Sequence, residues 1–91
     1  NLFKMGIETT WTEKEIKDII REFISRYVDI TLKDDTSISN DIDSLDSIEL
    51  CMEIEHKFGI LFKEHEEQNI YGECSVNNIY ENILHYIKPI S

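Results

Sequence analysis

Apolar residues recur every three or four positions along residues 12–27. They are Ile16, Ile19, Ile20, Phe23, Ile24 and Tyr27. This spacing places them on one face of a helix. Thr12 and Glu15 have the arrangement of a capping box, and Trp11 and Ile16 have the spacing of a hydrophobic staple. The pattern predicts a first helix over 12–27.

A second periodic segment begins at about Ser44 and ends at Phe58, where Gly59 is a suitable left-handed stop. Either Asp43 or Ser44 can cap its first turn. Its apolar residues form two adjacent lines: Leu45, Ile48 and Met52 in one, and Cys51, Ile54 and Phe58 in the other, with Leu50 on the flank. The pattern predicts a second amphipathic helix.

The last helix is predicted from the N-cap Ser75 to Ile87, with Pro89 ending it. Its stripe consists of Val76, Ile79, Tyr80, Ile83, Leu84 and Ile87. Residues 60–72 have a weaker pattern that predicts one short helix. Residues 28–43 are dense in Asp, Thr, Ser and Asn, which favour turns over helix interiors.

These elements predict an all-α fold: a small four-helix bundle with three main helices, one short helix, and a long loop between the first and second. We expect one domain over 12–88, an N-terminal extension over 1–11 and a tail over 89–91. Met5 is a candidate natural start, which would make residues 1–4 a cloning remnant. The expected core includes the following stripe residues: Leu50, Met52, Ile54, Phe62, Ile70 and Ile79.

Composition narrows the functional classes. The chain has 91 residues with Lys+Arg 9 and Asp+Glu 19, a formal net charge of −10. Such acidity repels phosphate backbones, which argues against nucleic-acid binding, and favours a basic partner surface. No apolar run approaches the roughly 20 residues of a membrane span, so stable membrane insertion is not expected. Cys51 and Cys74 lack metal or disulfide spacing and are interpreted as core residues in a reducing compartment.

Candidate chemistry lies at the start of the second helix. The segment 43–50 reads Asp-Ser-Leu-Asp-Ser-Ile-Glu-Leu and resembles the Asp-Ser-Leu signature of acyl carrier proteins. The resemblance continues through the second helix and the loop after it, at Met52, Ile54, Glu55, Phe58, Ile60 and Phe62. It covers about residues 10–88. It implies that Ser44 carries phosphopantetheine, derived from coenzyme A, whose thiol holds acyl groups as thioesters.

The resemblance also implies partners. These are a phosphopantetheinyl transferase and acyl-loading and synthase enzymes with basic patches, in fatty-acid, polyketide or related biosynthesis. The expected partner-binding residues are Asp43, Leu45, Asp46, Glu49, Met52, Glu53 and Glu55. The chain departs from the family at His56 and Lys57, where further acids are common. It departs again at residues 40–42, Asn-Asp-Ile, where the family has a glycine.

Other interpretations stay open. In one alternative, Ser44 has no role beyond capping the helix. In another, the hydroxyl of Ser47 is the attachment site. The acidic face of the second helix is also consistent with an ordinary solvated surface. A peptidyl or aminoacyl carrier, or an acidic helical adaptor without a prosthetic group, would use the same fold. We expect no enzyme activity, because Ser44 has no nucleophile elbow or local histidine base. No metal site is expected either. The expected protein is a monomer in the cytoplasm, with plastid or mitochondrial matrix as alternatives.

Overall fold

The computed structural model describes residues 7–90. The elements in this range are β1 (Ile7–Thr12), α1 (Glu13–Ser25), α2 (Ser44–Phe58), α3 (Glu64–Gly72), α4 (Val76–Ile83) and β2 (Ile87–Ile90). The expectation for residues 1–4 lies outside the described range. The predicted four-helix fold is confirmed. The structure adds a small two-stranded sheet, which the sequence pattern did not predict.

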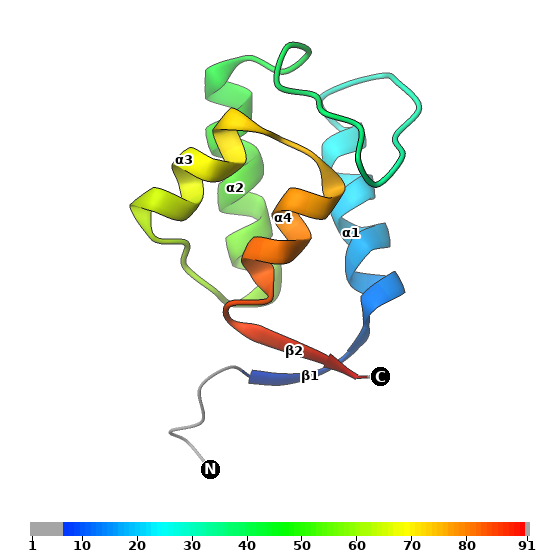
Figure 1. Cartoon of the computed structure of the whole chain (residues 1–91), viewed down its shortest axis with the longest axis vertical. Coiled ribbons are helices and arrows are strands. Elements are labelled where there is room, and N and C mark those ends of the chain that lie inside the picture. The colour runs from blue at the N-terminus through cyan, green and yellow to red at the C-terminus, as the bar shows by residue number, and fades with distance from the viewer. Residues whose placement is uncertain (1–6, 91) are drawn as a thin grey trace.

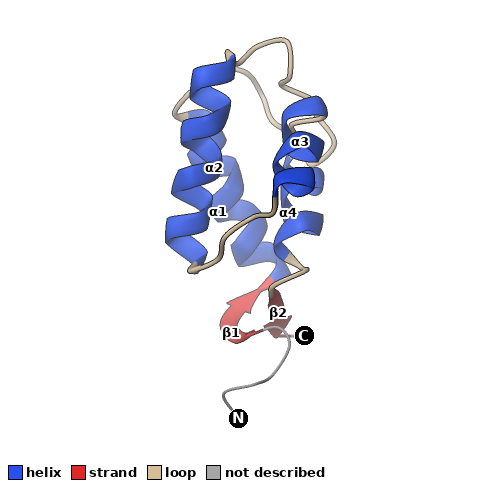
Figure 2. Ribbon diagram, turned by 90° about the vertical axis from the view of Figure 1, so that its left-hand side faces the viewer, coloured by secondary structure: helices blue, strands red, loops and turns tan. Residues whose placement is uncertain are grey.

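α1 and α2 run along the long axis of the molecule, α3 is inclined to it, and the sheet closes one end (Figures 1 and 2). α1 packs against α2 and α4, while α3 packs against α2 and α4 from the other side. The loop 26–43 crosses the opposite end and leads into α2 (Figure 1). The start of α2 and the sheet therefore lie at opposite ends of the bundle.

The first helix begins as its sequence predicts. The Glu15 N–H donates to Thr12 Oγ1 at 3.1 Å, and the Thr12 N–H donates to Glu15 Oε1 at 2.8 Å. This capping box satisfies two donors that would otherwise be unpaired at the helix start. Trp11 packs edge-on against Phe58 of α2, with ring centroids 5.0 Å apart.

The predicted extent of the last helix is wrong. α4 ends at Ile83, and residues 87–90 form β2, which pairs in parallel with β1 through Ile7↔Ile87 and Thr12↔Ile90. Strand pairing satisfies the backbone of this segment in place of another helical turn. Pro89, expected to end a helix, lies within β2. Proline is tolerated there because each strand of a two-stranded sheet is an edge strand.

The long loop is held by the α3–α4 connection. The Ile38 N–H donates to the Cys74 carbonyl at 2.8 Å, and the Cys74 N–H donates to Ser39 Oγ at 3.0 Å. Further along, the Asn77 N–H donates to the Asp34 carbonyl at 2.8 Å. Ile38 is fully buried beneath these bonds. The loop therefore reaches α2 along a defined path.

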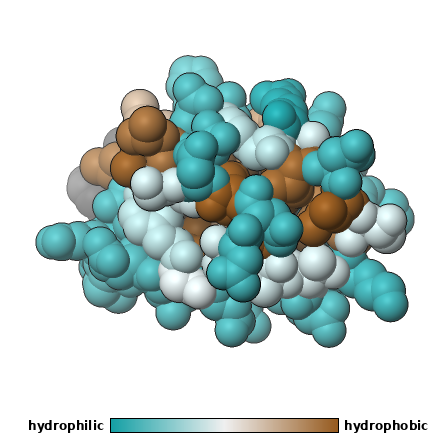
Figure 3. Space-filling model, turned by 90° about the horizontal axis from the view of Figure 1, so that it is seen from above, coloured by the Kyte–Doolittle hydropathy of each residue, from teal (hydrophilic) through white to brown (hydrophobic). Residues whose placement is uncertain are grey.

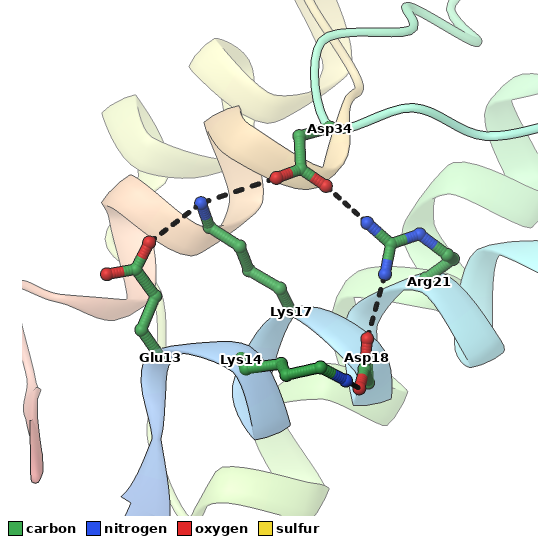
Figure 4. A pocket seen from close by; sticks show the side chains of 6 residues that line it. All are labelled: Glu13, Lys14, Lys17, Asp18, Arg21 and Asp34. Carbon is green, nitrogen blue, oxygen red and sulfur yellow. Dashed lines mark hydrogen bonds and ion pairs between the residues drawn. The ribbon is translucent and has the colours of Figure 1, made fainter.

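Alternating charges also tie this loop to α1 (Figure 4). The Asp34 carboxylate pairs with Arg21 and with Lys17, the latter at 3.5 Å. The cluster borders a hollow of about 480 Å³ lined by Glu13, Lys14, Lys17, Asp18, Arg21 and Asp34. Each cation in it has an acidic partner, so the cluster serves the fold by joining the loop to α1.

α2 buries only one of its two apolar lines. Its buried residues are Leu50, Cys51, Ile54 and Phe58. Five of the six expected core residues named above are buried: Leu50, Ile54, Phe62, Ile70 and Ile79. The sixth, Met52, is 61% exposed, so its assignment to the core is wrong. It lies in the other line with Leu45, 76% exposed, and Ile48, 43% exposed.

α3 is anchored at its N-terminus by a buried carboxylate. Glu66 is only 3% exposed. It accepts hydrogen bonds from the Lys63 N–H at 2.7 Å and from the Tyr86 hydroxyl, and it lies 2.5 Å from His85 Nδ1. Burial alone would raise the pKa of Glu66, but these hydrogen bonds outweigh burial and lower the pKa below its ordinary value of 4.5.

This lowered pKa predicts an acid-dependent loss of stability. The unfolded chain binds the Glu66 proton more readily than the folded chain, so the contribution of Glu66 is present above about pH 4.5 and is lost as pH falls through the folded pKa. We expect Glu66→Gln to show a flatter stability profile between about pH 5 and 3 in urea unfolding. Glu64→Gln, at an exposed position of α3, is the control. Parallel profiles for wild type and Glu66→Gln would contradict this role.

Candidate functional site

Ser44 is the first residue of α2 and lies exposed at the end of the molecule opposite the sheet. The N-cap is Asp43, whose Oδ1 accepts the Asp46 N–H at 2.8 Å. The sequence left Asp43 and Ser44 as alternative N-caps, and in the structure Asp43 is the cap. Within residues 7–90, the Ser44 hydroxyl makes no hydrogen bond to another side chain or to the backbone, and it is open to solvent.

The loop turns into α2 without the glycine that the family has in this segment. The N–H groups of Asp41 and Ile42 both donate to the Ile38 carbonyl, at 2.8 and 3.1 Å. Within the described part of the chain, Gly59 is the one residue with a positive φ, and it lies at the far end of α2. Residues 40–42 therefore make the turn with ordinary backbone angles, which explains why the glycine is dispensable here.

The first turn of α2 offers backbone donors to an anion. The first N–H groups of a helix have no acceptor inside the helix. Asp43 takes the Asp46 N–H, and the Ser44 and Leu45 N–H groups donate to nothing else in the described range. The helix dipole adds positive potential at this point. The nearby carboxylates reduce this positive potential. Their mutual repulsion also affects Asp46: loss of hydration, and then the charges of Asp43 and Glu49, raise the pKa of Asp46.

The surroundings of Ser44 do not activate it as a nucleophile. No histidine or other base hydrogen-bonds to its hydroxyl in the described structure, which a catalytic serine requires. The neighbouring Ser47 hydroxyl donates to the Asp43 carbonyl at 3.1 Å and is less exposed. Residues 7–90 also contain no group of three His, Cys, Asp or Glu side chains placed to hold a metal ion. Ser44 is therefore better placed to be modified than to catalyse.

Acidic side chains extend along α2 from Ser44. Glu49 and Glu53 both face the hydroxyl of Tyr27, which lies in the turn just after α1. This hydroxyl is 3.1 Å from Glu49 Oε1 and 2.8 Å from Glu53 Oε1. Burial and these two carboxylates raise the pKa of Tyr27. The sequence places Tyr27 in the core stripe, and its link to the acidic residues of α2 was missed because it depends on the packing of α1 against α2.

Glu55 is directed elsewhere. Its Oε2 accepts the Phe62 N–H at 2.7 Å, so this carboxylate supports the α2–α3 connection. The other predicted partner-binding residues share one surface with Ile48. We call this surface the docking face; it consists of Asp43, Leu45, Asp46, Ile48, Glu49, Met52 and Glu53. It combines acidic groups with the exposed apolar line of α2.

A small cavity adjoins Ser44. Its volume is about 210 Å³, and its lining residues are Ser39, Ile42, Ser44, Ser47, Ile48 and Tyr71. Figure 3 looks onto this end of the molecule and shows apolar surface among hydrophilic side chains. Tyr71 comes from α3, and no local sequence pattern indicates that it approaches Ser44.

This combination defines a class: a small helical protein that presents an exposed, unactivated serine beside an acidic helix, as carrier proteins do. Comparison with known protein sequences supports this class. No family model and no solved structure matches the chain, but curated relatives do. It is 35% identical over 72 residues to an acyl carrier protein of Campylobacter hominis, covering 77% of this chain and 90% of that protein.

Two further relatives have the same name. The chain is 35% identical over 74 residues, 80% of its length, to "Acyl carrier protein 4, chloroplastic" of Arabidopsis thaliana. It is 40% identical over 53 residues, 55% of its length, to an acyl carrier protein of Chloroherpeton thalassium. It spans 54% of the first relative and 66% of the second.

The chain belongs to the acyl carrier protein family. Members of this family are carrier proteins and not enzymes. None of the helices described here is both long enough and apolar enough to span a bilayer.

Proposed function

We propose that this protein carries acyl groups on phosphopantetheine esterified to Ser44. The observation that carries the proposal is the exposed Ser44 hydroxyl, which has no hydrogen-bond partner within residues 7–90 and lies in the Asp-Ser-Leu segment of a chain that belongs to the acyl carrier protein family. The delivery of acyl intermediates to synthase or transferase enzymes in fatty-acid, polyketide or related biosynthesis is part of this proposal.

The first turn of α2 fits the group. Ser44 Oγ would be the ester oxygen. A base of the transferase would take its proton, the new O–P bond would form to the phosphorus that bears pantetheine in coenzyme A, and the pyrophosphate bond would break with adenosine bisphosphate as the leaving group. The Ser44 and Leu45 N–H groups are available to the phosphate oxygens. When bound, phosphopantetheine supplies a thiol on a flexible arm that forms thioesters with acyl groups. The chain itself presents the hydroxyl, excludes no solvent around it and provides no base, so the chemistry of attachment belongs to the transferase.

The docking face is proposed to meet basic patches on that transferase and on acyl-loading and synthase enzymes. Its carboxylates attract cationic surfaces from a distance, and its exposed apolar residues, Leu45 and Met52, add contact area once the proteins meet. Exposed charges are screened by salt. The proposed complexes are therefore short-lived and weaken as ionic strength rises. Glu55 remains a proposed partner contact beside this surface, although one of its oxygens accepts the Phe62 N–H.

Intact mass spectrometry tests the proposal. Incubation of the wild-type protein with coenzyme A and a broad-specificity transferase is expected to add one phosphopantetheine per chain. No mass increase would overturn it. The mass of the protein isolated from its own cell identifies the cargo: an acyl group supports the proposal, and an amino acid or peptide would support an aminoacyl or peptidyl carrier instead.

The burial of Cys51 and Cys74 predicts that their thiols react slowly in the folded protein. Burial raises the pKa of Cys51 to about 12 and of Cys74 to about 11. Thiolates are the reactive species, so neither side chain competes with the arm for acyl groups. We expect no fast-reacting thiol with Ellman's reagent in the apo protein, one in the modified protein, and two more after unfolding. Fast reaction of the native apo protein would contradict this expectation.

Buried free thiols also suit a reducing compartment. The cytoplasm is the proposed location, with the plastid and the mitochondrial matrix as alternatives.

A further inference from the structure

We propose that the cavity beside Ser44 seats the first segment of the phosphopantetheine arm, the carbon that bears two methyl groups next to the phosphate. This inference rests on the function proposed above. It assigns a binding role to Ile42, Ile48 and Tyr71, three residues that were not among the expected site residues. Because Ser44 itself lines the cavity, a group esterified to its hydroxyl begins at the cavity wall.

The lining leaves mainly apolar surface for a ligand. The Ser39 hydroxyl accepts the Cys74 N–H at 3.0 Å and donates to the Gly72 carbonyl at 3.2 Å. The Ser47 hydroxyl donates to the Asp43 carbonyl. Since these hydroxyl protons are already used, the larger side chains, Ile42, Ile48 and Tyr71, offer the remaining contacts. A branched alkyl group is the chemistry that such a lining accepts.

The Tyr71 ring forms one side of the cavity. Tyr71 is partly buried and packs against the hydrophobic core, and its phenol lies close to the buried Cys51 thiol of α2. Ile42 is nearly buried at the end of the long loop, while Ile48 is 43% exposed at the rim. The cavity is therefore bounded by the loop, α2 and α3 together, and it is open where Ser44 lies.

The size of the cavity limits what it holds. At about 210 Å³ it is smaller than the roughly 300–1,000 Å³ of pockets that enclose drug-sized ligands. It has room for the dimethyl carbon and its neighbours but not for the whole arm. The two amides and the thiol of the arm come later in the chain of atoms and remain in solvent, where partner enzymes reach them.

Two other hollows among residues 7–90 do not have this chemistry. The hollow of about 480 Å³ at α1 is lined by paired charges. Another, of about 270 Å³, lies between α3 and α4; its lining residues are His65, Asn69, Asn78, Glu81, Asn82 and His85, all polar. Neither includes Ser44, so neither receives the beginning of a group attached there.

Nuclear magnetic resonance of the modified protein tests the inference. The arm is transferred from coenzyme A labelled with ¹³C in its two methyl groups. We expect nuclear Overhauser effects from these methyls to the Ile48 methyls and the Tyr71 ring protons, and an upfield shift of the arm methyls relative to free pantetheine. Methyl shifts equal to those of free pantetheine, without such contacts, would overturn the inference.

Variants separate the cavity from general effects on the fold. Tyr71→Leu is expected to abolish the upfield shift, and Ile48→Ala to increase the mobility of the arm methyls. Leu84→Ala is the matched control, since Leu84 is 40% exposed but lies at the end of α4 near the sheet. Unchanged spectra in both cavity variants would also overturn the inference. An absent mass increase in the wild type is a separate result, which refutes the proposed function itself.

Discussion

Replacing Ser44 with alanine is expected to abolish the addition of phosphopantetheine completely, because the side-chain oxygen that would be esterified is gone. The fold should persist. Ser44 is exposed, Asp43 makes the helix cap, and substitutions at such surface positions change the free energy of unfolding by no more than about 0.5 kcal/mol. Intact mass and circular dichroism of the same sample measure both effects.

Ser47→Ala is the matched control for Ser44→Ala. It removes the nearest other hydroxyl of α2, which is bonded to the Asp43 carbonyl. This variant should gain the same mass as the wild type. A mass increase in Ser44→Ala, or its loss in Ser47→Ala alone, would move the attachment site and contradict our assignment.

Leu50→Ala is expected to cause a large loss of stability. The Leu50 side chain is fully buried in the core, and truncation of a buried leucine costs about 2–5 kcal/mol. Small domains are stabilised by only about 5–15 kcal/mol in total. The variant should therefore unfold at a much lower urea concentration, measured by the change in ellipticity.

Met52→Ala provides the comparison on the same helix. Met52 is 61% exposed, so its truncation should change the free energy of unfolding by no more than about 0.5 kcal/mol. Equal losses in Met52→Ala and Leu50→Ala would show that the two faces of α2 are not distinguished as described. Because Met52 belongs to the docking face, its substitution is expected to slow modification by the transferase while leaving the fold unchanged.

This pair of residues shows what sequence periodicity does and does not determine. The apolar spacing of α1 identifies its buried residues, because its polar and apolar faces are clearly separated. α2 has apolar residues in two lines, and spacing alone does not tell which one meets α1 and α3. The packing leaves the line of Leu45, Ile48 and Met52 exposed, as the family resemblance implied for Leu45 and Met52 but not for Ile48.

The C-terminal segment was mispredicted for a related physical reason. Its apolar spacing suits a helix through Ile87, but residues 87–90 find backbone partners in residues 7–12. That pairing joins segments about 80 residues apart, and no local pattern reports it. At the candidate site, the motif predicts Ser44 as the attachment residue, and this stays a prediction. Tyr27 and Tyr71 were not recognised, since their roles depend on contacts between helices.

The parallel pairing of β1 with β2 has a practical consequence. It brings Ile7 and Ile87 side by side at the end of the bundle away from Ser44. A fluorophore or a sensor surface attached at β1 or β2 would therefore lie at the end of the bundle away from the serine. Immobilised in this way, the protein can be titrated with one enzyme after another while its modified end stays accessible.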